Sequence, residues 1–423
     1  MFSTMRNAWK IRDLRKKMIF TLLMLIVSRA GSFIPVPYIN VEAMSRMTEG
    51  GSLFGFFDLL SGGAFKNFTI FALGVVPYIN SSIIVNLLTI AIPKLEQLSK
   101  EGEEGRKKIA SYTRYGTIIL GTIQSYGIAL LLKREGALLK DSPFHIFIII
   151  LTLMVGTAFL MWLGEQITEK GVGNGISMLI FTNIVSRYPV MGVQIAGLIK
   201  VQTANWIELI LFIIITILTV MAVVTMEMGE RRIPVQYAKR VVGRKTYGGQ
   251  NTHIPINVNS SSVIAIIFAM SIMQFPATLA VFFPDKGWTA AFKQGGLFYT
   301  DSYLYWLVYF LLVIFFTWFY TEITFNTKDM ADNLKKNGGF VPGIRPGKPT
   351  EDYVQTILNR ITLIGGTFAG IIALMPYALD KFTGLKGLQF GGTSVLIVVG
   401  VALETAKQIE AQMTMRHYQG FLR

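Results

Sequence analysis

The sequence has no cysteine, only three histidines and few charged residues. Without cysteine the chain can form neither a disulfide framework nor a thiolate metal site. His145, His253 and His417 lack the spacing of metal ligands, so a metal site is not expected. Charged residues make up 15% of the chain and apolar residues 52%, more apolar surface than a soluble fold of this length could bury. The composition therefore predicts an integral membrane protein.

Ten long apolar stretches predict ten transmembrane helices, because about 20 apolar residues are needed to cross the hydrocarbon core. Arg187, Tyr188 and Pro189 interrupt the fifth stretch, which is the least regular. An even number of spans places both termini on one side of the membrane. The expected spans are residues 18–36, 67–92, 113–132, 144–164, 175–197, 206–226, 258–283, 303–325, 358–378 and 390–408.

The 40 Lys and Arg residues are distributed unevenly between alternate loops. The N-terminal segment, the tail and the loops on their side hold more than twice as many as the opposite loops. Because basic residues near span ends resist translocation, both termini are expected in the cytoplasm. The net charge of +15 would draw this face to anionic lipid headgroups and to acidic or nucleic-acid-bearing partners.

Ten spans divide into two sets of five, residues 1–201 and 202–423. An odd number of spans in each half would insert the second half upside down, which is the inverted-repeat arrangement. The expected fold is an all-α integral membrane protein of ten transmembrane helices in two inverted five-helix halves. This division depends on the span count, since no repeat is visible at the level of residues.

Glycine and proline interrupt two spans that occupy corresponding places in the two halves. Gly74 and Pro77 lie in the second span, and Pro276 follows Gln274 and Phe275 in the seventh. In inverted-repeat folds such broken helices indicate the working site. Proline kinks packed inside a bundle are the alternative for each position alone. Polar residues in or near the same helices need partners or water: Asn80, Asn86, Gln124 and Asn259.

Residues 51–64, ahead of the second span, contain a short amphipathic segment. Leu53, Phe56, Phe57 and Leu60 recur with a helical period. About ten helical residues reach only about 15 Å, too little to span the membrane. Glycine pairs at both ends would let the segment swing as a unit, and a helix lying in the membrane interface is the alternative.

Two loops on the basic side, residues 227–257 and 326–357, are too long to be plain connectors. Their tips carry Arg244 and Lys245 in one loop and Arg345 in the other, flanked by Gly and Pro. Exposed cations on stiff loops are typical of a docking surface for a large anionic or acidic partner.

No catalytic constellation is evident, so the protein is not expected to be an enzyme. The ionisable residues in the spans, Arg29, Glu208, Glu322 and Glu404, are few and lie near span ends. A structural role is favoured for each over ion coupling. A secondary transporter for a small solute remains the competing class, because it shares inverted repeats and broken helices. The sequence shows neither a nucleotide-hydrolysing site nor a clear pair of residues for ion coupling. Transport by this chain would therefore need energy supplied by a separate protein.

Several long motifs, in order along nearly the whole chain, carry a family resemblance. They are IFALGVVPYI (70–79), KEGEEGRKK (100–108), MWLGEQITEKGVGNG (161–175), DNLKK (332–336) with FVPGIRPG (340–347), and FGGTS (390–394). With these motifs the chain closely resembles the bacterial SecY family, the pore-forming subunits of the general protein-secretion channel.

The resemblance implies an hourglass channel between the two halves, narrowed by a ring of branched apolar side chains. A ring of this kind can dewet and block ions, yet yield around a moving chain. Its members would be Val75, Ile79, Ile180, Ile267 and Ile397. The segment at 51–64 would be the plug of the closed pore, with the side chains Leu53, Phe54, Phe56, Phe57 and Leu60.

The resemblance also implies a lateral gate and a set of partners. The second and seventh spans, with the third beside them, would part to release signal sequences into lipid, along a seam that includes Asn86, Gln124, Asn259 and Phe275. Arg244, Lys245 and Arg345 would engage the SecA ATPase or a translating ribosome. SecE and SecG would be the companion subunits, secretory preproteins and their signal peptides the cargo, and the plasma membrane the location. No cofactor is implied.

Overall fold

The structure, a computed structural model, is mostly helical. It describes residues 2–40, 58, 61–134, 136–193, 206–237, 240–242, 245–247, 251–258, 262–282, 287–292, 296–299, 302–383 and 392–421. The helices of the first half are α1 (Phe2–Lys10), α2 (Arg12–Gly31), α5 (Val76–Ala91), α6 (Pro93–Lys100), α7 (Glu103–Arg134), α8 (Pro143–Lys170) and α9 (Gly175–Val185).

The second half adds helices and short strands. Its helices are α11 (Trp206–Met228), α12 (Ser262–Phe282), the 3₁₀ helix η1 (Gly287–Phe292), α13 (Tyr303–Thr324), α14 (Thr327–Lys336), α15 (Lys348–Thr383) and α16 (Gly392–Phe421). Its strands are β1 (Glu230–Tyr237), β2 (Arg240–Val242), β3 (Lys245–Tyr247), β4 (Asn251–Asn257) and β5 (Gly339–Phe340).

The predicted helical membrane architecture is confirmed. Within the described residues, seven helices are long and apolar enough to cross a membrane, or eight if α5 and α6 form one span bent by 101°. The other two expected spans correspond to α2 and to α12, whose apolar part, Val263–Pro276, is shorter. Ten spans, with both termini on one side, stay a prediction.

The bounds of the second span, predicted as residues 67–92, are wrong. Helix α5 begins only at Val76, with Pro77 in its first turn, where the missing N–H of proline costs nothing. The residues just before it form turns, with Gly74 in the left-handed region at φ +57°. Gly74 and Pro77 therefore mark the start of a helix and not a kink within one. Pro276, by contrast, does lie inside α12.

Two other spans also differ from the predicted bounds. Helix α2 ends at Gly31, and residues 32–36 are not helical. The fifth span is broken as its sequence suggested: α9 ends at Val185, residues 186 and 187 form a turn, and helical structure resumes from Tyr188 to Val193.

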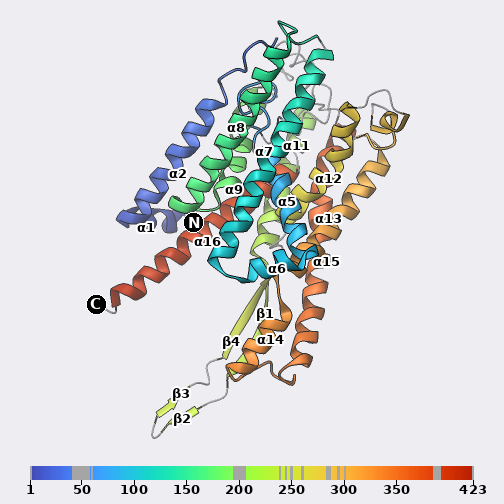
Figure 1. The fold of residues 1–423 in the computed structure, drawn as a ribbon. Coiled ribbons are helices and arrows are strands. Elements are labelled where there is room, and N and C mark those ends of the chain that lie inside the picture. Colours follow the sequence, from blue (N-terminus) through green and yellow to red (C-terminus); the bar gives the residue numbers. More distant parts are fainter. Residues whose placement is uncertain are drawn as a thin grey trace.

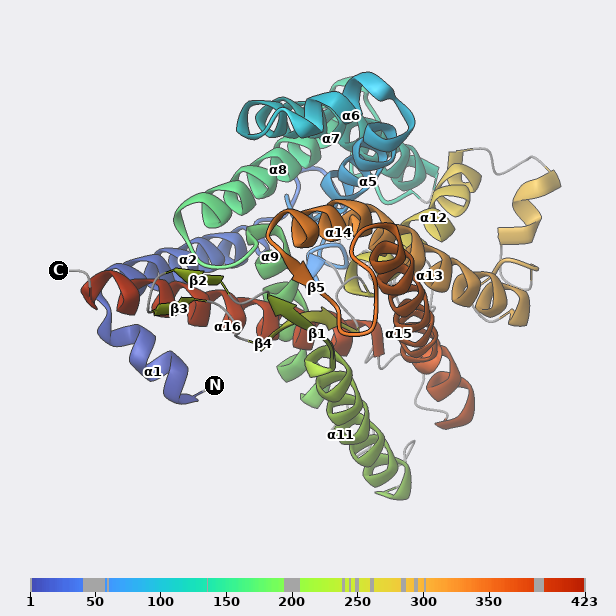
Figure 2. The same cartoon turned by 90° about the horizontal axis from the view of Figure 1, so that it is seen from below.

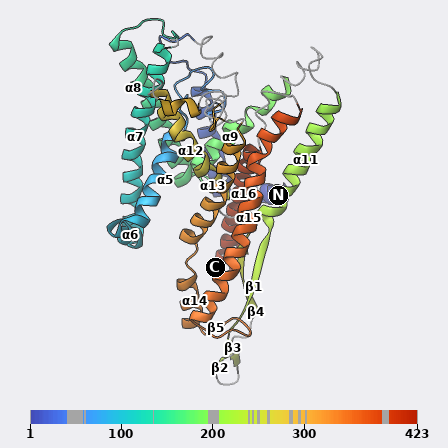
Figure 3. The same cartoon turned by 90° about the vertical axis from the view of Figure 1, so that its right-hand side faces the viewer.

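Helices of the two halves gather on opposite sides of the molecule. Figure 2 shows α5, α7 and α8 on one side of the view, α13 and α15 on another and α9 near the centre, while α16 runs in from the side of α1 and α2. The halves contact one another where α12 meets α5 and α7, and where α16 meets α9 and α1. In Figure 3, α7 and α8 stand apart from α11 and α15. The division into 1–201 and 202–423 stays a prediction, because no contact by itself fixes that boundary.

The two long, basic loops, residues 227–257 and 326–357, are not extended connectors. Their described parts fold together into one unit. Strand β1 pairs antiparallel with β4 from its own loop and with β5 from the other, and β2 pairs with β3 near the tip. Figure 1 shows the strands and α14 together at one end of the molecule, the end toward which α1 and the last turns of α16 also lie. We call β1, β4, β5, α14, the segment from Val341 to Gly347 and the first turns of α15 the loop unit.

The loop unit has an apolar core of its own. Ile233, Ile256, Val341, Val354 and Leu358 are buried against one another. They come from β1, β4, the segment after β5, and α15. Alternation of buried and exposed residues along β1 matches the period of a half-buried strand. Side chains from two loops that lie about 100 residues apart thus hold each other in place.

Candidate functional site

Four of the five predicted ring residues lie on four different helices, two from each half, and the fifth directly precedes one of them. Val75 is the residue before α5, Ile79 lies on α5, Ile180 on α9, Ile267 on α12 and Ile397 on α16. Four of them are buried in the central apolar cluster of the bundle, and Ile267 is partly buried against the same cluster. A closed constriction and ordinary helix packing both require this burial, so the ring stays a prediction.

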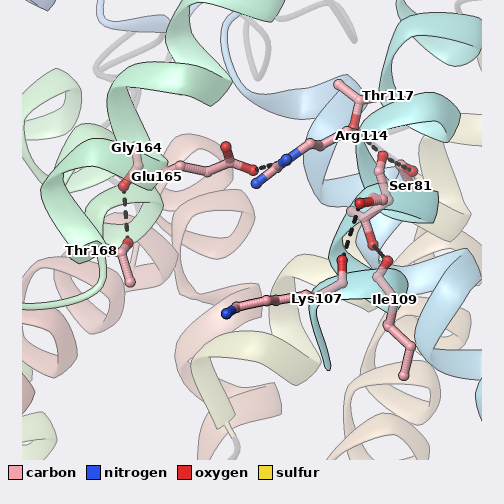
Figure 4. Close-up of polar contacts among 10 residues, drawn as sticks. Ser81, Lys107, Ile109, Arg114, Thr117, Gly164, Glu165 and Thr168 are labelled. Carbon is pink, nitrogen blue, oxygen red and sulfur yellow. Dashed lines mark hydrogen bonds and ion pairs between the residues drawn. The ribbon is translucent and has the colours of Figure 1, made fainter. Parts of the chain in front are cut away.

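Helices α5 and α7 pack closely in the first half, on one side of the predicted gate. Ser81 Oγ on α5 donates a hydrogen bond to the Thr113 carbonyl on α7 at 2.7 Å (Figure 4). A Cβ at Gly116 would lie 2.3 Å from Ser81 Oγ, so glycine at this position leaves room for the Ser81 hydroxyl in the orientation that makes this bond. Small residues and interhelical hydrogen bonds are typical of permanent helix contacts in membranes.

An ion pair joins α7 to α8. Arg114 Nε on α7 lies 2.7 Å from Glu165 Oε1 on α8, and Figure 4 shows the two side chains pointing toward one another. Thr168 Oγ1, one turn further along α8, donates to the Gly164 carbonyl and accepts the amide N–H of Gly175 at the start of α9. Helices α5, α7, α8 and α9 are therefore linked by polar contacts as well as by packing.

The residues of the predicted polar seam differ in their exposure. Gln124 on α7 is half-buried, whereas Asn86 and Phe275 are exposed, Phe275 by 62%; Asn259 lies outside the described residues. In the described part of the chain, Gln124 Oε1 and Asn80 Oδ1 are buried without a hydrogen-bond partner. Unpaired carbonyl oxygens of this kind are costly in a packed bundle, so a hydrogen-bond donor that reached them would lower that cost.

Only the C-terminal base of the predicted plug falls within the described residues. Leu53, Phe54, Phe56, Phe57 and Leu60 lie outside them. Asp58 is buried, with 2% of its side chain exposed, and its Oδ2 lies 2.8 Å from Arg187 Nη2. Its Oδ1 accepts the Lys66 backbone N–H at 2.7 Å. The base of this segment is thus a compact, internally bonded turn.

Arg29 of α2 holds the same turn from another side. Arg29 Nη1 donates to the Gly62 carbonyl at 3.0 Å, and its guanidinium carbon lies 5.5 Å from the centre of the Phe33 ring. The structural role favoured for Arg29 by the sequence thus has a defined partner. Sequence reasoning missed Asp58 and Arg187; the signal was an acidic residue in the glycine-bracketed segment and an arginine breaking the fifth span.

Of the predicted basic tips, Arg345 is presented by the loop unit. Arg345 is exposed, between Gly343 and Gly347, which adopt positive φ of +81° and +100°. Its own carbonyl accepts a hydrogen bond from Thr350 Oγ1 at 2.8 Å, which fixes the turn into α15. Lys245 begins β3, opposite Val242, and Arg244 lies outside the described residues.

Glu322, which the sequence left without a specific role, is part of a hydrogen-bond chain at the junction of the bundle and the loop unit. Gln355 Nε2 on α15 donates to Glu322 Oε1 on α13, and Thr327 Oγ1 on α14 donates to Gln355 Oε1 at 2.9 Å. The carboxylate thereby ties α13 to α15 and, through Gln355, to α14.

Comparison with known proteins decides the family. The SecY family profile matches residues 69–406. The chain belongs to the SecY family. The Protein translocase subunit SecY of Halalkalibacterium halodurans is 46% identical over 433 residues and covers all of both chains. The subunit of the same name from Thermotoga maritima is 42% identical over 436 residues, covering 100% of this chain and 98% of its own.

Solved structures agree on the fold. A protein-conducting channel superposes with a TM-score of 0.67 at 21% identity, over 94% of this chain and 92% of its own. Sec61 from the canine ribosome-channel complex of the endoplasmic reticulum gives 0.64 at 19% identity, over 94% and 92%. The SecY fold predicted from the sequence motifs is therefore confirmed.

Proposed function

We propose that this SecY-family chain is the central, pore-forming subunit of a protein-conducting channel. In this role it passes secretory polypeptides across the plasma membrane and releases apolar segments into lipid through a lateral gate. The observation that carries the proposal is the full-length similarity, at up to 46% identity among the relatives named above, to subunits called protein translocase. The alternative, a secondary transporter of a small solute, has no comparable support.

The pore of this channel would close at Val75, Ile79, Ile180, Ile267 and Ile397. Support comes from their chemistry and their positions, because all are branched and apolar and they reach the central cluster from both halves. Apolar constrictions block ions by excluding water and not by charge. Parting the halves would open such a ring, whereas a ring on one half could not open in this way.

The gate would open where α12 meets α5 and α7. Contacts between the halves on this side involve few elements, while α5, α7 and α8 are joined to one another by close packing and polar bonds. The buried unpaired oxygens of Asn80 and Gln124 would gain partners when water or a signal peptide enters. Asn86, Asn259 and Phe275 are proposed to complete the seam.

The loop unit would bind the partner that drives transport. Arg345, Arg244 and Lys245 are proposed to engage a SecA ATPase or a translating ribosome, since guanidinium groups bind carboxylates and RNA phosphates alike. Small SecE and SecG subunits are proposed to complete the channel. Both termini and the loop unit would face the cytoplasm, where anionic lipids would attract the basic surface.

Reconstitution tests the proposal directly. Proteoliposomes containing the chain with SecE and SecG are mixed with SecA, ATP and a radiolabelled secretory precursor, and protease-protected precursor is scored. We expect protection that requires both SecA and ATP. Absence of protection with folded chain and active SecA would overturn the channel assignment, and accumulation of a small solute driven by an ion gradient would favour the transporter.

A further inference from the structure

A groove with no charged side chain in its lining lies between the sheet of the loop unit, helix α14 and the end of α13. Its volume is about 450 Å³, within the range of roughly 300–1,000 Å³ that is typical of ligand sites. We propose that this amide groove binds an extended, uncharged segment of the precursor polypeptide by its backbone, before that segment enters the pore. The inference rests on the proposed channel function. The lining residues are Tyr237, Ile254, Thr324, Phe325, Asn326, Met330, Asn333, Leu334 and Asn337.

The first support is the spacing of two asparagine side chains on α14. Asn333 and Asn337 lie four residues apart, which on an α-helix is a rise of about 6 Å along one face. An extended peptide presents a backbone N–H and C=O toward the same edge at every second residue, about every 6.7 Å. A carboxamide carries both donors and an acceptor. The two asparagines can therefore bond to alternate residues of one extended chain.

The second support is that both amides are available and are presented by a well-capped helix. Asn333 and Asn337 are exposed, and within the described part of the chain neither makes a hydrogen bond through its side chain. At the start of α14, Asn326 Oδ1 accepts the Asp329 N–H at 3.1 Å. At its end, the Asn337 N–H donates to the Asn333 carbonyl at 3.0 Å. The backbone of α14 is thus satisfied at both ends without the two side-chain amides.

Apolar side chains beside the amides form the floor of the groove. Met330 and Leu334 share the α14 face with the two asparagines, because positions i, i+3, i+4 and i+7 lie on one side of a helix. The Tyr237 ring lies close against β5, since a Cβ at Gly339 would be 2.9 Å from Tyr237 Cε1. Main-chain hydrogen bonds at an edge, with apolar contacts for alternate side chains, are the features of extended-peptide recognition.

The uncharged lining separates the amide groove from the basic tip of the same unit. Arg345 is suited to an acidic or nucleic-acid-bearing partner, whereas the groove lining offers no cation to a carboxylate or a phosphate. Recognition of the main chain does not depend on sequence, as a channel with many different cargoes requires. Figure 2, seen from the loop-unit end, shows α14 near the middle of the view. A chain that approaches the middle of the bundle from that end therefore passes α14.

The absence of cysteine from this chain allows a single introduced thiol to report what enters the groove. Thr324→Cys places that thiol in the lining but away from the two amides, and a photocrosslinker is attached to it in channels reconstituted with cysteine-free SecE and SecG. SecA, ATP and a radiolabelled precursor are then added, the precursor is stalled by a folded C-terminal domain, and the sample is irradiated. Lys328→Cys, exposed on the other side of α14, is the matched control.

We expect Thr324→Cys to crosslink to the precursor and Lys328→Cys not to do so. Adding Asn333→Leu and Asn337→Leu, which keep the side-chain size but remove the amides, should lower the yield about fivefold, roughly the effect of losing one neutral hydrogen bond. With both amides present, proline at alternate positions of the stalled precursor segment should lower the yield similarly, because proline has no N–H. Alanine at the same positions should leave the yield unchanged.

Equal yields from Thr324→Cys and Lys328→Cys would overturn the proposal, and so would a yield that neither the leucine pair nor proline lowers. A crosslink from Thr324→Cys to SecA, with none to the precursor, would also overturn it and would assign the groove to SecA. Failure of the parent channel to give protease-protected precursor would instead overturn the proposed channel function.

Discussion

The base of the plug segment, which is buried in the helix bundle, and the loop unit are held in place by different forces. The plug base depends on a buried ion pair and on arginine bonds to a glycine turn. The loop unit depends on an apolar core that joins two loops. Figure 1 places the loop unit at one end of the bundle, and the C-terminal end of α2, which carries Arg29, toward the other.

The difference has a physical meaning. Apolar burial stabilises by roughly 25 cal/mol per Å² removed from water, and all of it is lost when the surfaces separate into water. Paired charges recover hydration on separation, so their net loss is smaller. An apolar core therefore suits a joint that stays closed while it transmits force, and an ion pair suits a joint that opens. We infer that the loop unit stays assembled.

The largest effect is expected at the exposed tip of the loop unit. Arg345→Glu reverses a charge without touching the apolar core, and like charges facing one another at an interface cost several kcal/mol. SecA-driven transport should fall by at least about tenfold, while membrane insertion and assembly with SecE and SecG persist. Lys328→Glu, an equally drastic change at an exposed position on α14, is the control and should transport normally.

Normal precursor transport by the Arg345→Glu variant would remove Arg345 from the docking surface and would leave the loop unit without an assigned contact.

The next largest effect concerns the predicted ring of branched apolar side chains. The double variant Ile267→Gly with Ile397→Gly widens the constriction and should make the resting membrane leak ions, measured as single-channel conductance. Two exposed isoleucines on α15, Ile364 and Ile371, provide a matched double glycine control without leak. Unchanged conductance in the ring variant would count against these two positions as part of the constriction.

A moderate effect tests whether the loop unit is held by its apolar core. Leu358, 2% exposed, and Leu363, 58% exposed, lie on the same helix. Leu358→Ala should destabilise the loop unit by about 2–5 kcal/mol, seen as faster proteolysis within residues 227–257 and 326–357. Leu363→Ala should leave the cleavage rate unchanged. Equal rates in the two variants would show that the core does not hold the loops.

The smallest effect is expected at Glu322, where the bundle meets the loop unit. Glu322→Ala removes the acceptor of the Gln355 bond, whose loss should cost about 1 kcal/mol and lower the melting temperature by a few degrees. A double variant with Gln355→Ala should cost little more, because the two residues share one interaction. Loss of transport with unchanged stability would instead indicate a role in transport itself.

The membrane architecture was predictable because lipid constrains a sequence strongly. The long apolar stretch at 144–164 lies within α8, and the one at 303–325 corresponds closely to α13. A stretch of about 20 apolar residues has few other stable conformations in hydrocarbon. The second span was misjudged in part, because residues 67–75 are as apolar as a helix but are buried in protein as turns.

The loop unit was predicted only as two protruding basic loops. Its strands pair across about 100 residues of sequence, and β5 is only two residues long, so no local periodicity could indicate it. The tips themselves were visible as cations between glycines and prolines. The two loops form one unit because residues of one loop contact residues of the other in the folded chain. The residue types alone do not indicate these contacts.

The sequence by itself determined the membrane class, the helical architecture and the family, because hydropathy and long ordered motifs are properties of contiguous residues. Only the tertiary structure decided that Asp58 faces Arg187, that Arg29 holds Gly62, and that Glu322 lies against Gln355. Each of these contacts joins residues at least 30 positions apart. Such pairs form only when the packing of whole helices brings their ends together, and nothing in the local sequence fixes that distance.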